Sequence, residues 1–299
     1  MTYRSIDMKS VSDILGVDFI GPNVVVNGLN LANRELNGFN LSYIGHENYL
    51  EFIDQEEIVA VFISKQHFEF LDSKVKGNKT FFIVDNPEEQ FYKLHAFLYE
   101  KTDFYTAPLV SECGDNVVIH PTAVVEEGVI IQDNVLIGAN VVIHKGTVIG
   151  HNVVIHAGAV IGTQGLQVLY NGEVPYLVQH VGGVKIGDNV SVGANACIAN
   201  SLFDGYTEIG KSTKIDALVF IAHNCRVGKN CVLTTGVVMA GSSSLDDGVW
   251  LAPNSVILNR INVGQESLVC SHSLVMRNVP ENTKVIGVPA KRVGRTIAK

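Results

Sequence analysis

The 299-residue sequence is poor in charged residues, which make up 17% of it, and it contains one tryptophan and eight prolines. It has no run of 18 apolar residues, and its start lacks the basic segment and apolar run of a secretory signal. We therefore expect a cytoplasmic protein without membrane insertion. The five cysteines form no C-x-x-C pair, so we expect reduced structural thiols rather than disulfides or a metal site. The net charge of −8 argues against a nucleic-acid partner.

The feature that the sequence has in abundance is an aliphatic residue at every sixth position after residue 113. A six-residue period fits neither a helix nor a flat sheet. It favours a solenoid in which each short strand donates one aliphatic side chain inward and Gly or Asn forms the corners. The repeated residues fall in three runs: Ile119, Val125, Ile131, Ile137, Ile143, Ile149, Ile155, Ile161; Ile186, Val192, Ile198; and Ile209, Ile215, Ile221, Val227, Leu233, Met239, Leu245, Leu251, Ile257, Val263, Val269, Val275.

This pattern resembles the hexapeptide-repeat family over roughly residues 113 to 280. The resemblance implies triangular coils of 18 residues wound left-handed, and a homotrimer. We therefore expect a left-handed parallel β-helix preceded by a small α/β domain. The same solenoid also carries γ-carbonic anhydrases and purely structural proteins, so fold alone does not decide the activity. We find no histidine set spaced for a carbonic anhydrase metal site.

We expect three parts in the chain: residues 1–105, residues 106–280 and residues 281–299. The first part has no hexads, and its strand-like runs 58–63 and 80–84 alternate with helical patterns. One helix is predicted to begin within residues 85–89, because this segment offers a cap, a Pro at the first turn and acidic residues near the positive end of the helix dipole. The second part is the solenoid, and the third is a short tail.

A break in the hexad register predicts a loop over residues 163–182. The 25 residues between Ile161 and Ile186 are not a multiple of six, so the chain must leave the solenoid there. The loop mixes aromatic and turn residues, as a binding loop on a rigid scaffold does. A neutral surface insertion is the alternative.

The order of the parts resembles the N-acyltransferase of lipid A synthesis (LpxD), in which a uridine-binding domain precedes a hexapeptide solenoid. In that family the front segment reads approximately Ile-Ser-Phe-Leu-x-Asn-x-x-Tyr, and its aromatics and Asn hold the uracil. Tyr43 and Tyr49 match the aromatics, and His46 stands where Asn is expected. The resemblance implies a UDP- or dTDP-linked amino sugar as the substrate, contacted by these three residues.

The segment Ala222-His223-Asn224-Cys225 resembles the catalytic segment of the lipid A enzyme and of hexapeptide sugar acetyltransferases, where the His is the general base. The resemblance assigns Asp216 as the acid that orients His223. An 18-residue coil would stack Gly241 over His223 at about 5 Å, where its N–H would be an oxyanion donor. In the implied reaction a sugar amine attacks a thioester, without a metal or a covalent enzyme intermediate.

Two departures from the lipid A family decide the expected donor. The chain stops soon after a Gly287-to-Arg292 segment, and this ending is similar to sugar acetyltransferases in which it lies beside coenzyme A. Arg260 stands where the lipid A family carries a second His. We therefore expect acetyl-CoA as donor, bound by Arg260, Gly287, Lys291 and Arg292, and an acceptor sugar of O-antigen or capsule synthesis. The alternative is transfer of a 3-hydroxyacyl chain from acyl carrier protein to UDP-3-O-acylglucosamine, and the alternative for Arg260 is an ordinary surface arginine.

Overall fold

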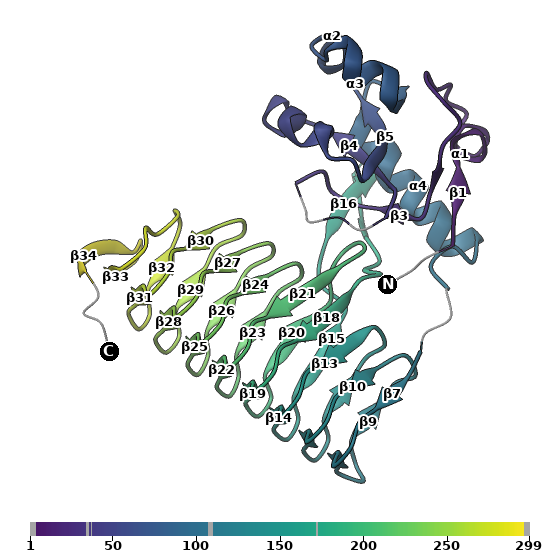
Figure 1. The fold of residues 1–299 in the computed structure, drawn as a ribbon. Coiled ribbons are helices and arrows are strands. Elements are labelled where there is room, and N and C mark those ends of the chain that lie inside the picture. Colours follow the sequence, from purple (N-terminus) through teal and green to yellow (C-terminus); the bar gives the residue numbers. More distant parts are fainter. Residues whose placement is uncertain (1–3, 34–35, 37, 107–109, 172, 296–299) are drawn as a thin grey trace. The chain divides into compact units, whose positions relative to one another are not determined.

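A computed structural model of the chain describes residues 4–33, 36, 38–106, 110–171 and 173–295 (Figure 1). The chain divides into two compact units. The front unit comprises residues 1–107 and 167–179, and the solenoid unit comprises residues 108–166 and 180–299. The middle of the predicted loop 163–182 therefore groups with the front unit. Within the described ranges, no helix has both the length and the apolar character needed to cross a membrane.

The front unit is built on a parallel sheet, and it is the small α/β domain expected from the sequence. Its strands lie in the order β3 (Gly28–Leu29), β4 (Asn40–Ile44), β5 (Ile58–Ile63) and β6 (Thr80–Ile83). The predicted strand runs are β5 and β6. A short antiparallel pair joins β1 (Ile6–Asp7) to β2 (Val25–Val26), and the helices are α1 (Met8–Leu15), the 3₁₀-helix η1 (Glu47–Asp54), α2 (Lys65–Glu69), α3 (Ser73–Asn78) and α4 (Pro87–Lys101).

Helix α4 begins as predicted and holds the inserted segment. The Asn86 side chain accepts a hydrogen bond from the Glu89 N–H at 3.2 Å, and Pro87 occupies the first turn. On the buried face of α4, His95 lies with Nε2 2.8 Å from the Gln179 carbonyl oxygen and Nδ1 2.7 Å from the Tyr105 hydroxyl. Gln179 ends the segment that contains the hairpin of β16 (Val168–Asn171) and β17 (Val174–Leu177).

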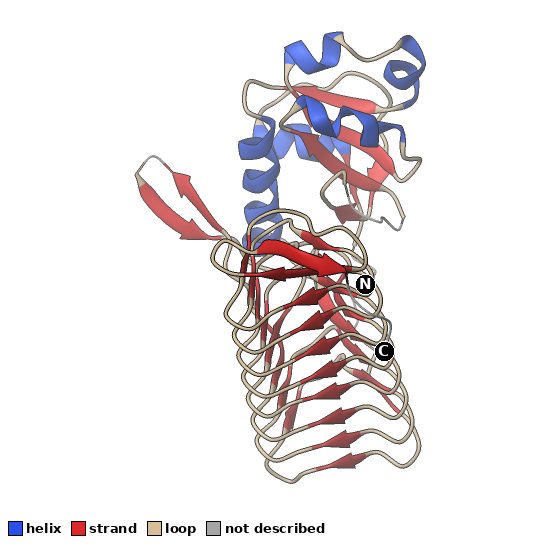
Figure 2. Cartoon of the chain, turned by 90° about the vertical axis from the view of Figure 1, so that its left-hand side faces the viewer, coloured by secondary structure: helices blue, strands red, loops and turns tan. Residues whose placement is uncertain are grey.

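The solenoid unit is a parallel β-helix. Each coil contributes three short strands, one to each of three parallel sheets (Figures 1 and 2). The β7 sheet contains β7 (Glu112–Cys113), β10 (Ile130–Ile131), β13 (Thr147–Ile149), β18 (Gly183–Ile186), β21 (Tyr206–Ile209), β24 (Arg226–Val227), β27 (Ser244–Leu245) and β30 (Asn262–Val263). The β8 sheet contains β8 (Val118–Ile119), β11 (Leu136–Ile137), β14 (Val154–Ile155), β19 (Ser191–Val192), β22 (Lys214–Ile215), β25 (Val232–Leu233), β28 (Trp250–Leu251), β31 (Leu268–Val269), β33 (Thr283–Ile286) and β34 (Lys291–Arg295). The β9 sheet contains β9 (Val124–Val125), β12 (Val142–Ile143), β15 (Val160–Thr163), β20 (Cys197–Ala199), β23 (Phe220–Ile221), β26 (Val238–Met239), β29 (Val256–Ile257) and β32 (Leu274–Val275).

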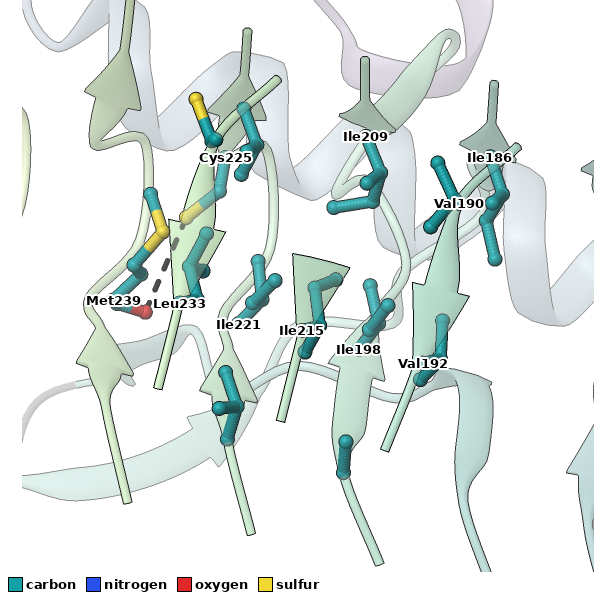
Figure 3. Close-up of a cluster of buried hydrophobic side chains, with 14 of the residues drawn as sticks. Ile186, Val190, Val192, Ile198, Ile209, Ile215, Ile221, Cys225, Leu233 and Met239 are labelled. Atoms are coloured by element: carbon teal, nitrogen blue, oxygen red, sulfur yellow. Dashed lines mark hydrogen bonds between the residues drawn. The ribbon is translucent and has the colours of Figure 1, made fainter. Parts of the chain in front are cut away.

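The repeated aliphatic residues point inward and form one continuous core, as the hexad pattern predicts. Figure 3 shows this core in the middle coils, where Ile198 and Ile221 stack on successive turns of the β9 sheet. The residues from Ile131 to Val275 in the repeat are almost entirely buried. The two exceptions are Ile119, which is 41% exposed, and Val125, which is half-buried, because β8 and β9 are edge strands with a neighbour on one side only.

The described residues of the predicted C-terminal tail, 281–295, continue the solenoid. Strand β33 pairs in parallel with β31, and β34 folds back antiparallel on β33, so both extend the β8 sheet. Val285 is buried in the solenoid core. The hexad pattern does not predict this continuation, because the six-residue period ends at Val275.

His95 makes the front unit sensitive to acid. Burial lowers the pKa of its imidazole to about 4, so the folded state holds the neutral ring whereas the unfolded chain binds a proton near pH 6.5. Stability from this group is complete above pH 6.5 and is lost as the pH falls from there towards 4, by about 3 kcal/mol in total. We expect the protection factors of the α4 amides, which are corrected for intrinsic exchange at each pH, to fall over this range in the wild type and much less in His95→Gln. An equal fall in both proteins would contradict this assignment.

Candidate active site

His223 lies at a corner of the solenoid, directly after strand β23 and before β24. It is half-buried, unlike the inward-pointing Ile221 two residues earlier, so its ring borders the outside of the coil. The next residue, Asn224, is buried and turns the chain with a left-handed backbone, φ +58°. Asn tolerates this conformation better than most residues, which is why Asn recurs at the corners of this solenoid.

Asn224 sets the tautomer of the neutral His223 ring. The Asn224 Oδ1 atom accepts a hydrogen bond from the Leu202 N–H at 3.0 Å, and Nδ2 donates to Ser201 Oγ at 2.6 Å, so the orientation of the amide is determined. The His223 Nδ1 atom lies 2.9 Å from the same Oδ1. Because Oδ1 can only accept, Nδ1 carries the proton in the neutral ring, and the lone pair is on Nε2. That tautomer is the one a general base acting through Nε2 requires.

Gly241 lies next to the Nε2 side of His223, one coil further on, as the sequence predicts. Strands β23 and β26 pair Ile221 with Met239, and the Ser242 N–H donates to the His223 carbonyl at 2.9 Å. A Cβ atom on Gly241 would lie 2.7 Å from Nε2, so any side chain there would crowd the base. For the Gly241 N–H, no acceptor occurs among the residues that the structure describes.

The expected partnership of His223 with Asp216 is wrong for a single chain. Asp216 follows β22 in the β8 sheet, whereas His223 follows β23 in the β9 sheet, so the two residues occupy different corners of one coil. The Asp216 carboxylate is exposed and accepts a hydrogen bond from the Ala217 N–H at 2.7 Å. The group at the His223 Nδ1 atom is Asn224.

The three expected base-binding residues lie around the end of β4 in the front unit. Tyr43 is half-buried, donates from its hydroxyl to Glu88 at 3.1 Å, and packs its ring 5.0 Å from Phe91. His46 is exposed and caps η1 by accepting the Asn48 N–H at 3.2 Å. Tyr49 lies in η1 with its ring 6.3 Å from Phe52. The tyrosines therefore pack on different neighbours, Tyr43 on α4 and Tyr49 within η1.

The expected donor-binding residues fall into two places. Arg260 is exposed at a left-handed corner, and its N–H donates to the Gly241 carbonyl at 3.1 Å, one coil beyond Gly241. Lys291 and Arg292 are exposed and line a cavity of about 520 Å³ at the last coils, together with Arg277 and other residues. Gly287 lies at the turn between β33 and β34, and its N–H donates to Ser273 Oγ at 3.1 Å.

His180 is a neighbour of His223 that sequence reasoning missed. Its ring centroid lies 5.0 Å from that of His223, at an interplanar angle of 85°. The hexad pattern carries no information about it, because it lies in the register break. Among the residues that the structure describes, no group of three His, Cys, Asp or Glu is placed to bind an ion.

The chain is similar in sequence and in structure to hexapeptide-repeat transferases. Family models match the chain: the bacterial transferase hexapeptide (six repeats) over residues 111–145, 128–163 and 206–241, and the hexapeptide repeat of succinyl-transferase over residues 183–217. The UDP-N-acetylglucosamine acyltransferase of Bacteroides fragilis has a similar structure (TM-score 0.55, 25% identity, 63% of this chain and 74% of that one). That of Francisella novicida is also similar (TM-score 0.52, 25% identity, 62% and 69%). The family models and these structures place the chain among the hexapeptide-repeat acyltransferases, and the expected left-handed parallel β-helix is confirmed.

Sequence relatives narrow the class to a family. The UDP-3-O-acylglucosamine N-acyltransferase of Campylobacter lari is 34% identical over 302 residues, covering 94% of this chain and 91% of the relative. That of Methylorubrum extorquens (strain PA1) is 40% identical over 116 residues, 39% of this chain, and this match spans only 33% of the relative's length. The chain belongs to the UDP-3-O-acylglucosamine N-acyltransferase family. The names of these relatives favour the alternative expectation, acyl transfer to UDP-3-O-acylglucosamine, over the acetyl transfer that we expected first.

Asn224→Ala should lower the turnover of acyl transfer about 10- to 100-fold, because the tautomer and orientation of His223 are no longer fixed. The matched control is Asn230→Ala. Asn230 has the same left-handed backbone, φ +55°, but is exposed at another corner, so this variant carries the backbone strain alone. Steady-state kinetics and melting temperatures of both variants check the prediction. Equal loss of turnover in both would show that Asn224 acts through stability only.

Proposed function

We propose that this protein transfers a 3-hydroxyacyl chain from acyl carrier protein to the amine of UDP-3-O-acylglucosamine, a step of lipid A synthesis. The full-length similarity to the Campylobacter lari relative supports the substrate class. The observation that carries the chemistry is the His223 ring, whose Nδ1 proton is directed at Asn224 while Nε2 faces the Gly241 backbone. No nucleic acid enters this reaction.

In the proposed reaction, His223 Nε2 removes a proton from the sugar amine as the nitrogen attacks the thioester carbonyl. The hydrogen bond from the Nδ1–H group to Asn224 Oδ1 stabilises the resulting imidazolium, and the proton stays on Nδ1. The Gly241 N–H, for which no partner occurs among the described residues, stabilises the oxyanion of the tetrahedral intermediate. Collapse of that intermediate expels the carrier thiolate, and His223 returns the proton to the sulfur.

The front unit supplies the proposed nucleotide contacts. Tyr43, His46 and Tyr49 lie at the carboxyl end of β4 in a parallel sheet, which is where ligands bind in open α/β sheets. The exposed His46 ring stands at the first turn of η1, and its Nδ1 atom already accepts the Asn48 N–H. We propose that these residues contact the uracil, and that Arg260, Gly287, Lys291 and Arg292 contact the phosphate-bearing donor.

We also propose that the protein is a homotrimer, because one flat face of the solenoid is apolar along its whole length. The residues that point outward from the β9 sheet carry no charge: Val124, Val142, Val160, Cys197, Phe220, Val238, Val256 and Leu274. The β7 sheet instead presents Glu112, Lys185, Glu208 and Arg226. A continuous apolar face of this kind marks an interface. His223 follows β23 of the β9 sheet, so a second copy on this face would border the site.

The donor assay tests the function directly. We expect turnover with 3-hydroxyacyl carrier protein and UDP-3-O-acylglucosamine, and a loss of about 10²- to 10⁴-fold in His223→Ala. The control is His156→Ala, an exposed histidine of the same solenoid. The same enzyme is offered acetyl-CoA with a panel of UDP- and dTDP-linked amino sugars. Turnover confined to acetyl-CoA would replace the lipid A reaction by nucleotide-sugar N-acetylation, and full activity in His223→Ala would remove the proposed base.

Light scattering tests the assembly. We expect the wild type at three times the chain mass of 32.4 kDa. Val238→Glu places a charge on the apolar face of the β9 sheet and should dissociate the trimer, because an unpaired charge is costly to bury. Ser244→Glu adds the same charge to the β7 sheet and should leave the mass unchanged. A monomeric wild type, or dissociation by Ser244→Glu alone, would refute this interface.

A further inference from the structure

The ring of His180 forms a T-shaped pair with the ring of His223, and the proposed reaction gives His180 no role. His180 is 3% exposed and is the first residue of the solenoid unit after the excursion through residues 167–179. The ring pair is held at a 5.0 Å centroid distance and an 85° angle, which is a favourable geometry for two aromatic rings. Because His180 is buried, its ring contacts His223 and is shielded from solvent.

The backbone of His180 is clamped from two sides. The Gln164 side chain accepts the His180 N–H at 2.9 Å and donates to the His180 carbonyl at 3.0 Å. The Asn200 side chain donates to the same carbonyl at 3.4 Å, and the Asn200 carbonyl oxygen lies 3.4 Å from the His180 Nδ1 atom. These bonds join the two ends of the excursion to the coil beneath His223. The position of the His180 ring is therefore determined by the fold.

Gly165 lies so close to the two histidines that no side chain fits at its position. A Cβ atom at this position would lie 2.3 Å from His180 Cε1 and 3.0 Å from His223 Cβ. The absence of a side chain at residue 165 is thus a condition of the ring contact. The His223 ring is consequently bounded by Asn224 at Nδ1, by Gly241 at Nε2 and by His180 against its ring.

We propose that His180 is a positioning residue for the transfer reaction: its ring packs against His223 and keeps Nε2 directed along the Gly241 backbone. This inference rests on the proposed function of His223 as the base. Packing of the His180 ring orients His223, and the nitrogen atoms of His180 take no part in the proton transfer. Loss of the ring contact should lower kcat about tenfold, the order of one aromatic pair, and leave KM for both substrates unchanged.

The test compares two replacements of opposite character. His180→Phe keeps a ring but removes both nitrogens, and His180→Asn keeps a polar group but removes the ring. We expect His180→Phe to retain kcat within about threefold and His180→Asn to lose about tenfold, both with unchanged KM. Gly165→Ala is a second probe, since its methyl group would displace the His180 ring. It should lower kcat in the same way as His180→Asn, and it should also lower the melting temperature because the methyl group overpacks this buried site.

Three results would overturn the proposal. These are an equal kcat in His180→Asn and wild type, a loss in His180→Phe as large as in His180→Asn, or a rise in KM in place of a fall in kcat.

NMR of histidine-labelled protein separates this proposal from the proposed function. If the wild type is inactive with every donor, the function fails, yet the His223 ring resonances still decide the positioning role. Broadening or doubling of these resonances in His180→Asn supports it, and an unchanged spectrum contradicts it.

Discussion

The stacking of one coil on the next is the interaction on which the rest of this structure depends. Parallel hydrogen bonding along three sheets places each residue beside its counterpart one coil away, about 4.8 Å distant. Because the inward-pointing side chains of each hexad are buried against those of the neighbouring coils, a shift of one residue would expose the core. The same register that buries Ile221 on Met239 brings Gly241 over His223. Core packing and site geometry are therefore one constraint.

The breaks in this register are what distinguish the coil that carries His223. Ile161 pairs with Ile198, and Ile198 pairs with Ile221, so both steps are longer than the regular coil. The extra residues bring Ser201 beneath Asn224 and His180 beside His223. A regular coil lacks these additional residues and could not make these contacts. The site thus combines a rigid ladder, which fixes the backbone of His223, with irregular segments that fix its side chain.

The hexad period was sufficient to predict the core and the stacking of Gly241 on His223, since both follow from counting residues. It could not identify Asn224 as the partner of His223, because the partner depends on which corner each side chain occupies and not on the distance in sequence to Asp216. Nor could it find His180, whose approach is set by hydrogen bonds from Gln164 and Asn200. The strands β33 and β34 were missed for a similar reason: they pair with the sheet after the period has ended.

The most direct test of the account is the protonation of His223. Long-range proton–nitrogen NMR on protein labelled at histidine, with His223 assigned by comparison with His223→Ala, reports which ring nitrogen carries the proton in the neutral form. The hydrogen bonds around Asn224 predict a protonated Nδ1 and a bare Nε2. A ring protonated at Nε2 would contradict the account, because the nitrogen facing Gly241 could not then accept a proton from an amine.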